Sequence, residues 1–149
     1  MIEAYESGAA PAFELYALGL EHKHIPEIMA YSKLTARPLF VPSVGNFRQG
    51  MLVSIPLALD TLAGTPTTAA FQDAYVQHYA NAPHVRLMPT PASGKLDALA
   101  LNDTDDMEVF VFGNPAQRQV VLVARLDNLG KGASGAAVQN LDLMIAGHA

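Results

Sequence analysis

Cysteine is absent from this 149-residue chain, tryptophan is absent as well, and charged residues make up only 15% of it. Without cysteine, the chain offers no disulfide, no thiolate metal site and no cysteine nucleophile of its own. Its 9 basic and 14 acidic side chains give a net charge of −5, whereas a nucleic-acid binder would carry a surface rich in lysine and arginine. We therefore do not expect nucleic acid as a partner.

Long apolar runs and a leader are also missing. Charged residues or prolines interrupt every apolar stretch before it reaches the length that crosses a bilayer. The first residues, Met1–Glu6, are acidic and lack the apolar core of a signal peptide. We therefore expect a cytoplasmic protein with no membrane partner.

The residues that are present indicate one folded domain. Half of them are apolar, and a chain of 149 residues can bury a sizeable core. Prolines and glycines divide the sequence into pieces of strand or helix length, but no stretch is long and polar enough to link two domains. We predict a single domain over residues 1–149.

The strand signals favour an antiparallel arrangement. Met107–Phe112 and Gln119–Leu126 are rich in valine, phenylalanine and leucine and flank Gly113–Pro115, as is typical of a hairpin. Met51–Leu59 has alternating apolar residues, and Pro56 places it at an edge or a bulge because proline cannot donate to a ladder. Shorter strands are expected at Ala12–Leu18, Arg37–Val41 and Leu99–Leu101.

Three helices are expected between these strands. Pro26 suits the first turn of a helix that runs to about Leu34, and Thr65 and Pro66 have the character of a cap and a first-turn proline. The helix after that cap has an apolar face of Phe71, Ala74, Tyr75 and His78.

The last helix, Gly132–Ala146, has an apolar stripe and ends at Gly147. The stripe comprises Ala137, Val138, Leu141 and Ile145. Hairpin strands with interspersed helices predict an α+β fold, in which helices pack on a mixed, largely antiparallel sheet.

The densest polar cluster is His22–Glu27. In extended backbone His22 and His24 point to the same face, and Glu27 lies one turn into the following helix. The cluster could be an acid–base pair in which Glu27 sets the tautomer of one histidine, or it could hold a metal. Alternatively, one histidine caps the helix and the other is solvated. Because no third strong ligand stands out, we do not expect a metal.

Two glycine-containing segments are candidates for binding an anion or a cofactor. Val44–Gly50 carries Arg48, whose guanidinium suits a phosphate or carboxylate, unless it is only solvated in a turn. Asp127–Gly135 has small residues that let a ligand approach backbone N–H groups at a helix start. Its glycines fit the spacing G-x-G-x-x-G, but no parallel strand–helix–strand unit surrounds them. Close packing of the helix on a neighbour is the alternative.

The remaining polar and aromatic groups are assigned no chemistry. Asn102–Asp106 lacks the spacing and the glutamate of an EF-hand calcium loop, so we expect a solvated loop. Phe110 and Phe112 are expected in the core or at an interface.

Three segments together resemble N-acetyl-gamma-glutamyl-phosphate reductase of arginine biosynthesis, in its shorter bacterial form. They are His22–Glu27, Phe40–Gly50 and Asp127–Asn140, in that order. The resemblance covers essentially the whole chain, although a related final segment occurs in aspartate-semialdehyde dehydrogenases. It implies the C-terminal substrate and dimerisation portion, with a helix over about 128–149 that returns to a nucleotide-binding domain.

The family also has a Rossmann domain and a nucleophilic cysteine, and this chain contains neither. The resemblance therefore implies a fragment that is inactive alone. The family enzyme is an NADP-dependent oxidoreductase that reduces an acyl phosphate to an aldehyde through a thioacyl intermediate. The implied partners are a small acyl phosphate and further copies of the chain, and NADP is expected only in the complete enzyme. A non-catalytic oligomerisation or binding module with the same fold is the alternative.

The resemblance also implies roles for individual residues. His24, or else His22, would be the acid–base partner of the cysteine, and Glu27 would orient that histidine. Arg48 would bind the phosphate or carboxylate of the substrate. The residues expected at the nicotinamide end of the cofactor are Asn128, Gly132, Ala133 and Ser134.

Overall fold

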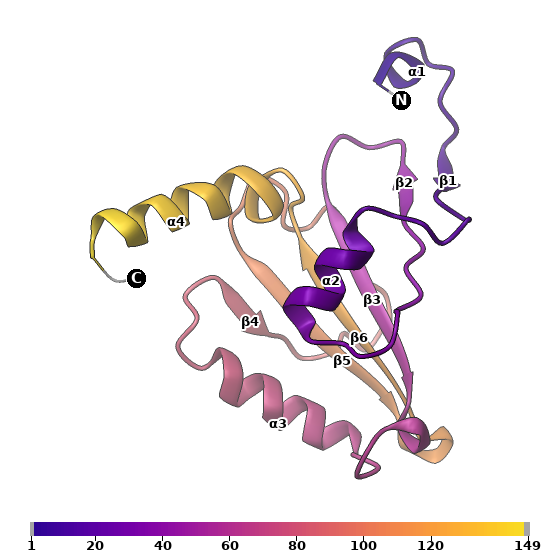
Figure 1. Ribbon diagram of the computed structural model, residues 1–149, viewed down its shortest axis with the longest axis vertical. Helices are drawn as coiled ribbons and strands as arrows, with labels where there is room; N and C mark the ends of the chain where they lie inside the picture. Colours follow the sequence, from indigo (N-terminus) through magenta and orange to yellow (C-terminus); the bar gives the residue numbers. More distant parts are fainter. Residues whose placement is uncertain (1, 148–149) are drawn as a thin grey trace. The chain divides into compact units, whose positions relative to one another are not determined.

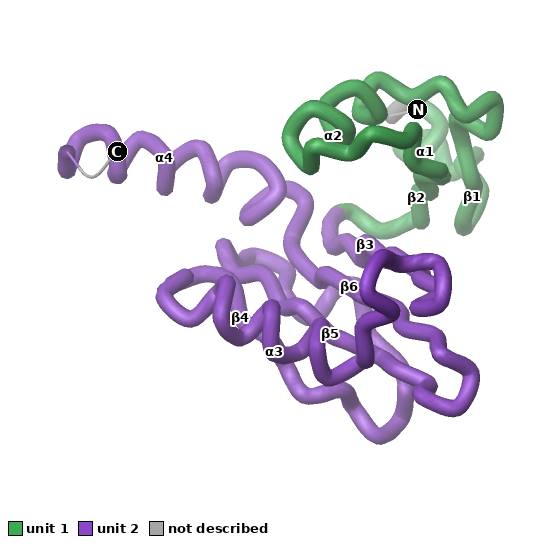
Figure 2. Tube along the Cα trace, turned by 60° about the horizontal axis from the view of Figure 1, so that its bottom comes forward, with its two compact units in different colours: residues 1–48 green, residues 49–149 purple. Residues whose placement is uncertain are grey.

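The computed structural model describes residues 2–147 and divides the chain into two compact units, residues 1–48 and residues 49–149 (Figure 2). Each unit contains a sheet of its own, with two strands in the first unit and four in the second. Among the described residues, no helix is long and apolar enough to span a membrane.

The first unit has a short antiparallel sheet of β1 (Phe13–Leu15) and β2 (Ser43–Gly45), preceded by α1 (Ile2–Glu6). β1 is shorter than predicted. Ala17 adopts a left-handed backbone conformation with a φ of 52°, and this ends the extended segment.

The strand predicted at Arg37–Val41 is wrong, because pairing begins only at Ser43. Pro38 and Pro42 lack the N–H group that a ladder needs. Pro42 contributes only its carbonyl, which accepts a hydrogen bond from the Tyr16 N–H at 3.1 Å. β2 therefore includes the start of the segment that the sequence favoured as a glycine-containing loop.

The helix predicted after the histidines is confirmed as α2 (His24–Ser32). Pro26 lies in its first turn, where the missing N–H costs no intrahelical bond. The helix ends at Lys33, which has a left-handed φ of 56° and donates its N–H to the Met29 carbonyl. Ile25 is buried, with 1% of its surface exposed.

The second unit has a sheet of four strands in the order β3-β6-β5-β4 (Figure 1). They are β3 (Met51–Ala58), β4 (Val85–Leu87), β5 (Met107–Asn114) and β6 (Gln119–Leu126). β6 pairs antiparallel with β3 and β5, and β4 pairs parallel with β5. The α+β fold, the mixed sheet and the β5–β6 hairpin are thus confirmed, and Pro56 lies on the edge strand β3.

The helix α3 (Thr68–Tyr79) covers one face of this sheet. Its cap is Thr67, whose hydroxyl accepts the Ala70 N–H at 3.2 Å, so the cap predicted at Thr65 is wrong. Thr65 instead has a left-handed φ of 41°. The inward face is also narrower than predicted, because Phe71 and Tyr75 pack on the core while Ala74 and His78 stay exposed. The centre of this core comprises Leu59, Val111, Val120 and Leu122.

The segment between β4 and β5 consists of turns, so the strand predicted at Leu99–Leu101 is wrong. The Asn102 N–H bonds back to the Leu99 carbonyl at 3.0 Å, which closes a turn where an extended strand was expected. The side chain of Phe110 is only 3% exposed, and Arg125 lies over its ring at 5.2 Å from the centroid. Phe110 is therefore a core residue.

The C-terminal helix begins with a π-helical turn, Gly130–Ser134, and continues as α4 (Gly135–Ile145). Gly147 follows with a φ of 68°, as expected for a helix terminator. In Figures 1 and 2, α4 extends away from the four-stranded sheet. Its apolar stripe is largely uncovered, since Val138, Leu141 and Ile145 are 57%, 54% and 76% exposed.

Candidate functional site

His22 and His24 lie side by side at the start of α2. Their ring centroids are 4.7 Å apart, and the ring of Phe40 lies 5.1 Å from His22 and 6.2 Å from His24. The ring of Tyr16 contacts His22 from another direction, at 5.7 Å. The two histidines that the sequence analysis singled out are therefore held in one aromatic cluster of the first unit.

The two imidazoles differ in what their nitrogens do. The Nδ1 atom of His22 accepts a hydrogen bond from the backbone N–H of His24 at 3.2 Å, and the His22 carbonyl accepts from the Ile25 N–H at 3.0 Å. His22 thus satisfies donors at the helix start, as a capping side chain does. Within residues 2–147, the His24 ring has no hydrogen-bond partner, and the residue is exposed. His24 is thus the histidine whose nitrogens remain available.

Glu27 is exposed on the first turn of α2 and has no side-chain hydrogen bond or ion pair within the described part of the chain. It does not contact either imidazole by hydrogen bonding. Nor do residues 2–147 contain a group of three or more His, Cys, Asp or Glu side chains placed to hold a metal.

Arg48 follows β2 at the end of the first unit and is exposed. Its guanidinium has no acidic partner among the described residues, whereas Arg37 of the same unit pairs with Glu21 at 2.9 Å. An unpaired guanidinium keeps its planar set of donors for an incoming phosphate or carboxylate.

In the second unit, a buried carboxylate lies where β6 ends. The side chain of Asp127 is 1% exposed. It accepts hydrogen bonds from the backbone N–H groups of Asp103 at 2.7 Å and Leu129 at 2.8 Å, and from the Gln49 amide at 2.9 Å. The bond from the Leu129 N–H is the main cause that holds the pKa of Asp127 below its usual range, and burial opposes it.

The residues predicted at the cofactor follow Asp127 along the chain. Asn128 is half-buried, and its Oδ1 accepts the Gly50 N–H at 2.8 Å. Gly132, Ala133 and Ser134 are exposed in the π-helical turn. The Gly132 N–H donates to the Asp127 carbonyl at 2.8 Å, and the Ser134 hydroxyl donates to the Leu129 carbonyl at 2.7 Å.

Several members of this network were missed by the sequence analysis. Asp103 was expected in a solvated loop, yet its Oδ1 accepts the Gln49 amide at 2.8 Å. In the same segment Asp106 pairs with His84 at 3.1 Å and with Arg86 at 2.5 Å. Gln49 lies two residues ahead of the apolar strand β3, and no local pattern distinguishes it from a solvated polar residue.

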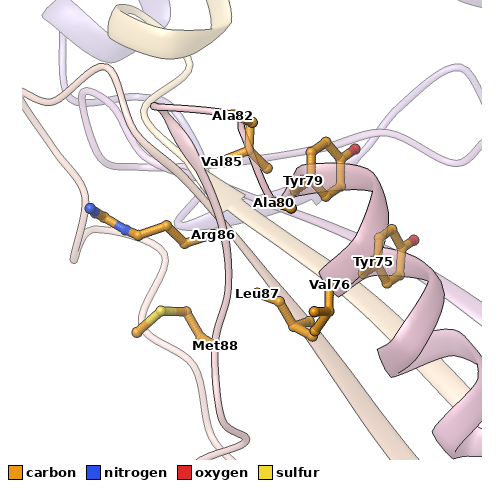
Figure 3. Close-up of a pocket in the computed structure, with 9 residues that line it drawn as sticks. All are labelled: Tyr75, Val76, Tyr79, Ala80, Ala82, Val85, Arg86, Leu87 and Met88. Atoms are coloured by element: carbon orange, nitrogen blue, oxygen red, sulfur yellow. The ribbon is translucent and has the colours of Figure 1, made fainter.

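An open groove of about 360 Å³ lies between α3 and β4 (Figure 3). Its lining is mostly apolar, and it includes Tyr75, whose pKa is raised chiefly by burial. Arg86 is the charged residue of the lining, but it is already paired with Asp106. None of the predicted site residues borders this groove, so it does not belong to the candidate site.

Comparison with known proteins gives a consistent result over most of the chain. Residues 3–128 match the model of a family described as "Semialdehyde dehydrogenase, dimerisation domain". N-acetyl-gamma-glutamyl-phosphate reductase 2 of Pseudomonas putida is 50% identical over 139 residues, which are 91% of this chain and 44% of the relative. These similarities confirm the resemblance found in the sequence.

Two further relatives have the same range of similarity. The N-acetyl-gamma-glutamyl-phosphate reductase of Sinorhizobium fredii is 51% identical over 93% of this chain and 45% of its own length. That of Brucella ovis is 51% identical over 88% of this chain and 43% of its own length. The chain thus spans less than half the length of the curated relatives it matches.

Proposed function

Because the chain belongs to the semialdehyde dehydrogenase dimerisation-domain family, we propose that it is the substrate-binding and dimerisation part of an N-acetyl-gamma-glutamyl-phosphate reductase. The observation that carries this proposal is the 50–51% identity to such reductases over about nine-tenths of the chain. The complete enzyme would reduce N-acetyl-glutamyl 5-phosphate to N-acetylglutamate 5-semialdehyde.

The residues present in the chain indicate which parts of the reaction it would carry and which parts the rest of the enzyme would supply. A cysteine nucleophile and a dinucleotide-binding domain would come from outside it, since it has no cysteine. When bound, NADPH would supply the hydride. We propose that the residues up to about 128 form the substrate and dimerisation domain, and that α4 packs on the nucleotide-binding domain. The uncovered apolar stripe of α4 supports this assignment.

His24 is proposed as the group that moves the proton. It would take the proton from the cysteine thiol, donate it to the oxygen of the hemithioacetal that hydride addition creates, and take it back as the hemithioacetal collapses to the aldehyde and the thiolate leaves. The His24 ring nitrogens, which have no hydrogen-bond partner in the part of the chain that the structure describes, support this role, whereas the Nδ1 of His22 is already used at the helix start. Glu27, one turn further along α2, is proposed to orient the His24 imidazole in the complete enzyme.

The cofactor side is proposed to be Asn128 with Gly132, Ala133 and Ser134. The exposed small residues of the π-helical turn leave room for a planar ring. The Asn128 amide nitrogen can still donate, because only its Oδ1 is used within residues 2–147. These residues are proposed to meet one end of NADP. The rest of the dinucleotide would be held by the nucleotide-binding domain.

Arg48 is proposed to bind the phosphate or carboxylate of the substrate, and Arg48→Ala in the complete enzyme tests this. The KM for the acyl phosphate is expected to rise by about 10- to 100-fold, the equivalent of a charge-assisted contact, with kcat less affected. Arg48→Lys is expected to restore binding only in part, because an ammonium does not reproduce the guanidinium fork.

Arg37→Ala is the matched control, since Arg37 is an exposed arginine of the same unit that pairs with Glu21. Its KM is expected to stay at the unmutated value. Equal KM values for Arg48→Ala and the unmutated enzyme would remove Arg48 from the site.

The chain is also expected to form homo-oligomers, as the family description implies. The edge strand β3 exposes apolar side chains on both of its faces, with Leu52, Val53 and Ile55 at 39%, 42% and 49%. Light scattering over a range of concentrations is expected to give a molar mass above that of one chain. A monomer at every concentration would contradict this prediction.

The proposed function itself is tested with the complete enzyme that contains this chain. NADPH oxidation that depends on N-acetyl-glutamyl 5-phosphate, with release of phosphate, is the expected result. A folded, dimeric protein without this activity would instead favour the alternative of a non-catalytic oligomerisation module.

A further inference from the structure

Asp127 is a buried acid with no part in the chemistry proposed above. A carboxylate that is 1% exposed is retained only where hydrogen bonds replace its water. The Asp127 carboxylate accepts hydrogen bonds from residues of three segments: Gln49 before β3, Asp103 before β5, and Leu129 after β6. The N–H of Gly130, the first residue of the π-helical turn, contributes to lowering the pKa of this carboxyl. One side chain thus ties together three segments that are distant in sequence.

The main chain of the same residue holds the next part of the turn. The Asp127 carbonyl accepts the Gly132 N–H at 2.8 Å. Gly130 is packed so closely that an added Cβ would lie 2.5 Å from the Thr104 carbonyl oxygen. The π-helical turn is therefore held in place by its hydrogen bond to Asp127 and by its close packing against the segment before β5.

The neighbouring Asn128 is oriented by the same construction. Its Oδ1 accepts the Gly50 N–H at 2.8 Å, and Gly50 follows Gln49, whose amide donates to Asp127 at 2.9 Å. Because the oxygen of the Asn128 amide is held by Gly50 directly before β3, the amide nitrogen, a donor, faces away from that strand. Gly50 has a φ of 111°, and an added Cβ would lie 2.6 Å from the Ala98 carbonyl oxygen, so this residue cannot shift easily.

We infer that Asp127, cross-linked to Gln49, is the positioning residue that presents Asn128 and the turn Gly130–Ser134 to the nicotinamide end of the cofactor. This inference rests on the proposed function. Its distinctive content is that a residue which touches neither substrate nor cofactor sets the affinity for the dinucleotide while leaving the affinity for the acyl phosphate unchanged.

The test is Asp127→Asn in the complete enzyme. Asparagine has nearly the same size as aspartate. However, its NH₂ group would point at N–H groups whose hydrogen bonds the carboxylate now accepts. The KM for NADPH is expected to rise by about tenfold or more, and the KM for the acyl phosphate to stay within twofold. A purely structural role would lower the amount of active enzyme and leave both KM values unchanged.

A second measurement tests the conformation of this segment without measuring enzyme activity. Amide hydrogen exchange at Leu129 or Asp103 is expected to be about tenfold faster or more in Asp127→Asn, because their N–H groups donate to different oxygens of the carboxylate and asparagine has only one. Gln49→Ala keeps the Asp127 carboxylate and removes the hydrogen bonds that the Gln49 amide donates to Asp127 and Asp103, so it is expected to show a smaller change in the same direction. Gln49→Ala also provides the test if Asp127→Asn does not fold. Gln72→Ala, an exposed glutamine on α3, is the control and is expected to leave both readouts unchanged.

The outcomes separate the inference from the proposed function. If the unmutated enzyme reduces the acyl phosphate but the KM for NADPH is unchanged in Asp127→Asn and Gln49→Ala, the inference is overturned and the function stands. Unchanged exchange at both Leu129 and Asp103 overturns it as well. If the unmutated enzyme has no reductase activity, the proposed function fails, and the cofactor role of Asp127 fails with it.

Discussion

The 149-residue chain alone is expected to show no reduction of N-acetyl-glutamyl 5-phosphate and no phosphate-dependent oxidation of the semialdehyde. The proposed reaction needs a thiolate that displaces phosphate and forms a thioacyl intermediate, and the chain has no cysteine to supply it. It also contains only the part proposed to meet one end of the cofactor. The expected effect is complete loss of turnover, measured as NADPH absorbance in both directions.

A full-length relative, such as the Pseudomonas putida reductase that is 50% identical to this chain, is the positive control in the same assay. Turnover by the pure chain that increases in proportion to its concentration would contradict the prediction. It would mean that the proposed cysteine chemistry is not the chemistry of this chain.

In the complete enzyme, His24→Ala is expected to lower kcat by about 10²–10⁴, the usual contribution of a general acid–base group. Its ring has no hydrogen-bond partner within residues 2–147 and is held beside His22 and Phe40 at centroid distances of 4.7 and 6.2 Å. The KM for the acyl phosphate is expected to change much less, because the anion contact is assigned to Arg48. Steady-state kinetics on purified, folded variants provide the measurement.

His22→Ala is the control that identifies the histidine involved. Removing its Nδ1 leaves the His24 N–H without an acceptor, so a loss of helix stability of about 1 kcal/mol is expected, with a smaller loss of kcat than in His24→Ala. Equal and small effects of both substitutions would remove the histidine pair from the active site. A larger effect of His22→Ala would reverse the two assignments.

The central sheet could be predicted from the sequence because its strands carry their own signals. β5 and β6 consist of β-branched and aromatic residues on both sides of one turn, so the hairpin follows from local propensity and pattern. β3 has alternating apolar residues, and Pro56 correctly assigned it to an edge. In such elements local preference and tertiary packing agree.

The short elements could not be predicted in the same way. Leu99–Leu101 is as apolar as a strand, but it lies in turns, and Leu101 is buried there with 8% of its surface exposed. Arg37–Val41 failed because prolines withhold the donors of a ladder. Burial by tertiary contacts, which no local pattern reveals, decides whether a short apolar run is a strand.

The sequence singles out candidate site residues, whose roles stay predictions, but not the buried residues that support them. The exposed Arg48 and the histidine pair belong to residue types that indicate chemistry in a sequence. Asp127 and Gln49 do not stand out, because an acid next to a glycine-rich segment is usually solvated. Only the fold, which brings the end of β6 to the start of β3, makes Asp127 a buried acceptor.

Pro56 on β3 also affects how the protein avoids aggregation. An edge strand of eight residues presents free backbone groups to which the strand of another molecule could add. Proline has no N–H group and is tolerated on edge strands, so Pro56, which lies opposite Val121, leaves one position in the middle of β3 without a donor. A second strand could not form an uninterrupted ladder along β3. Contacts between copies through this region would therefore depend on side chains, and stacking of strands into fibrils would be disfavoured at this edge.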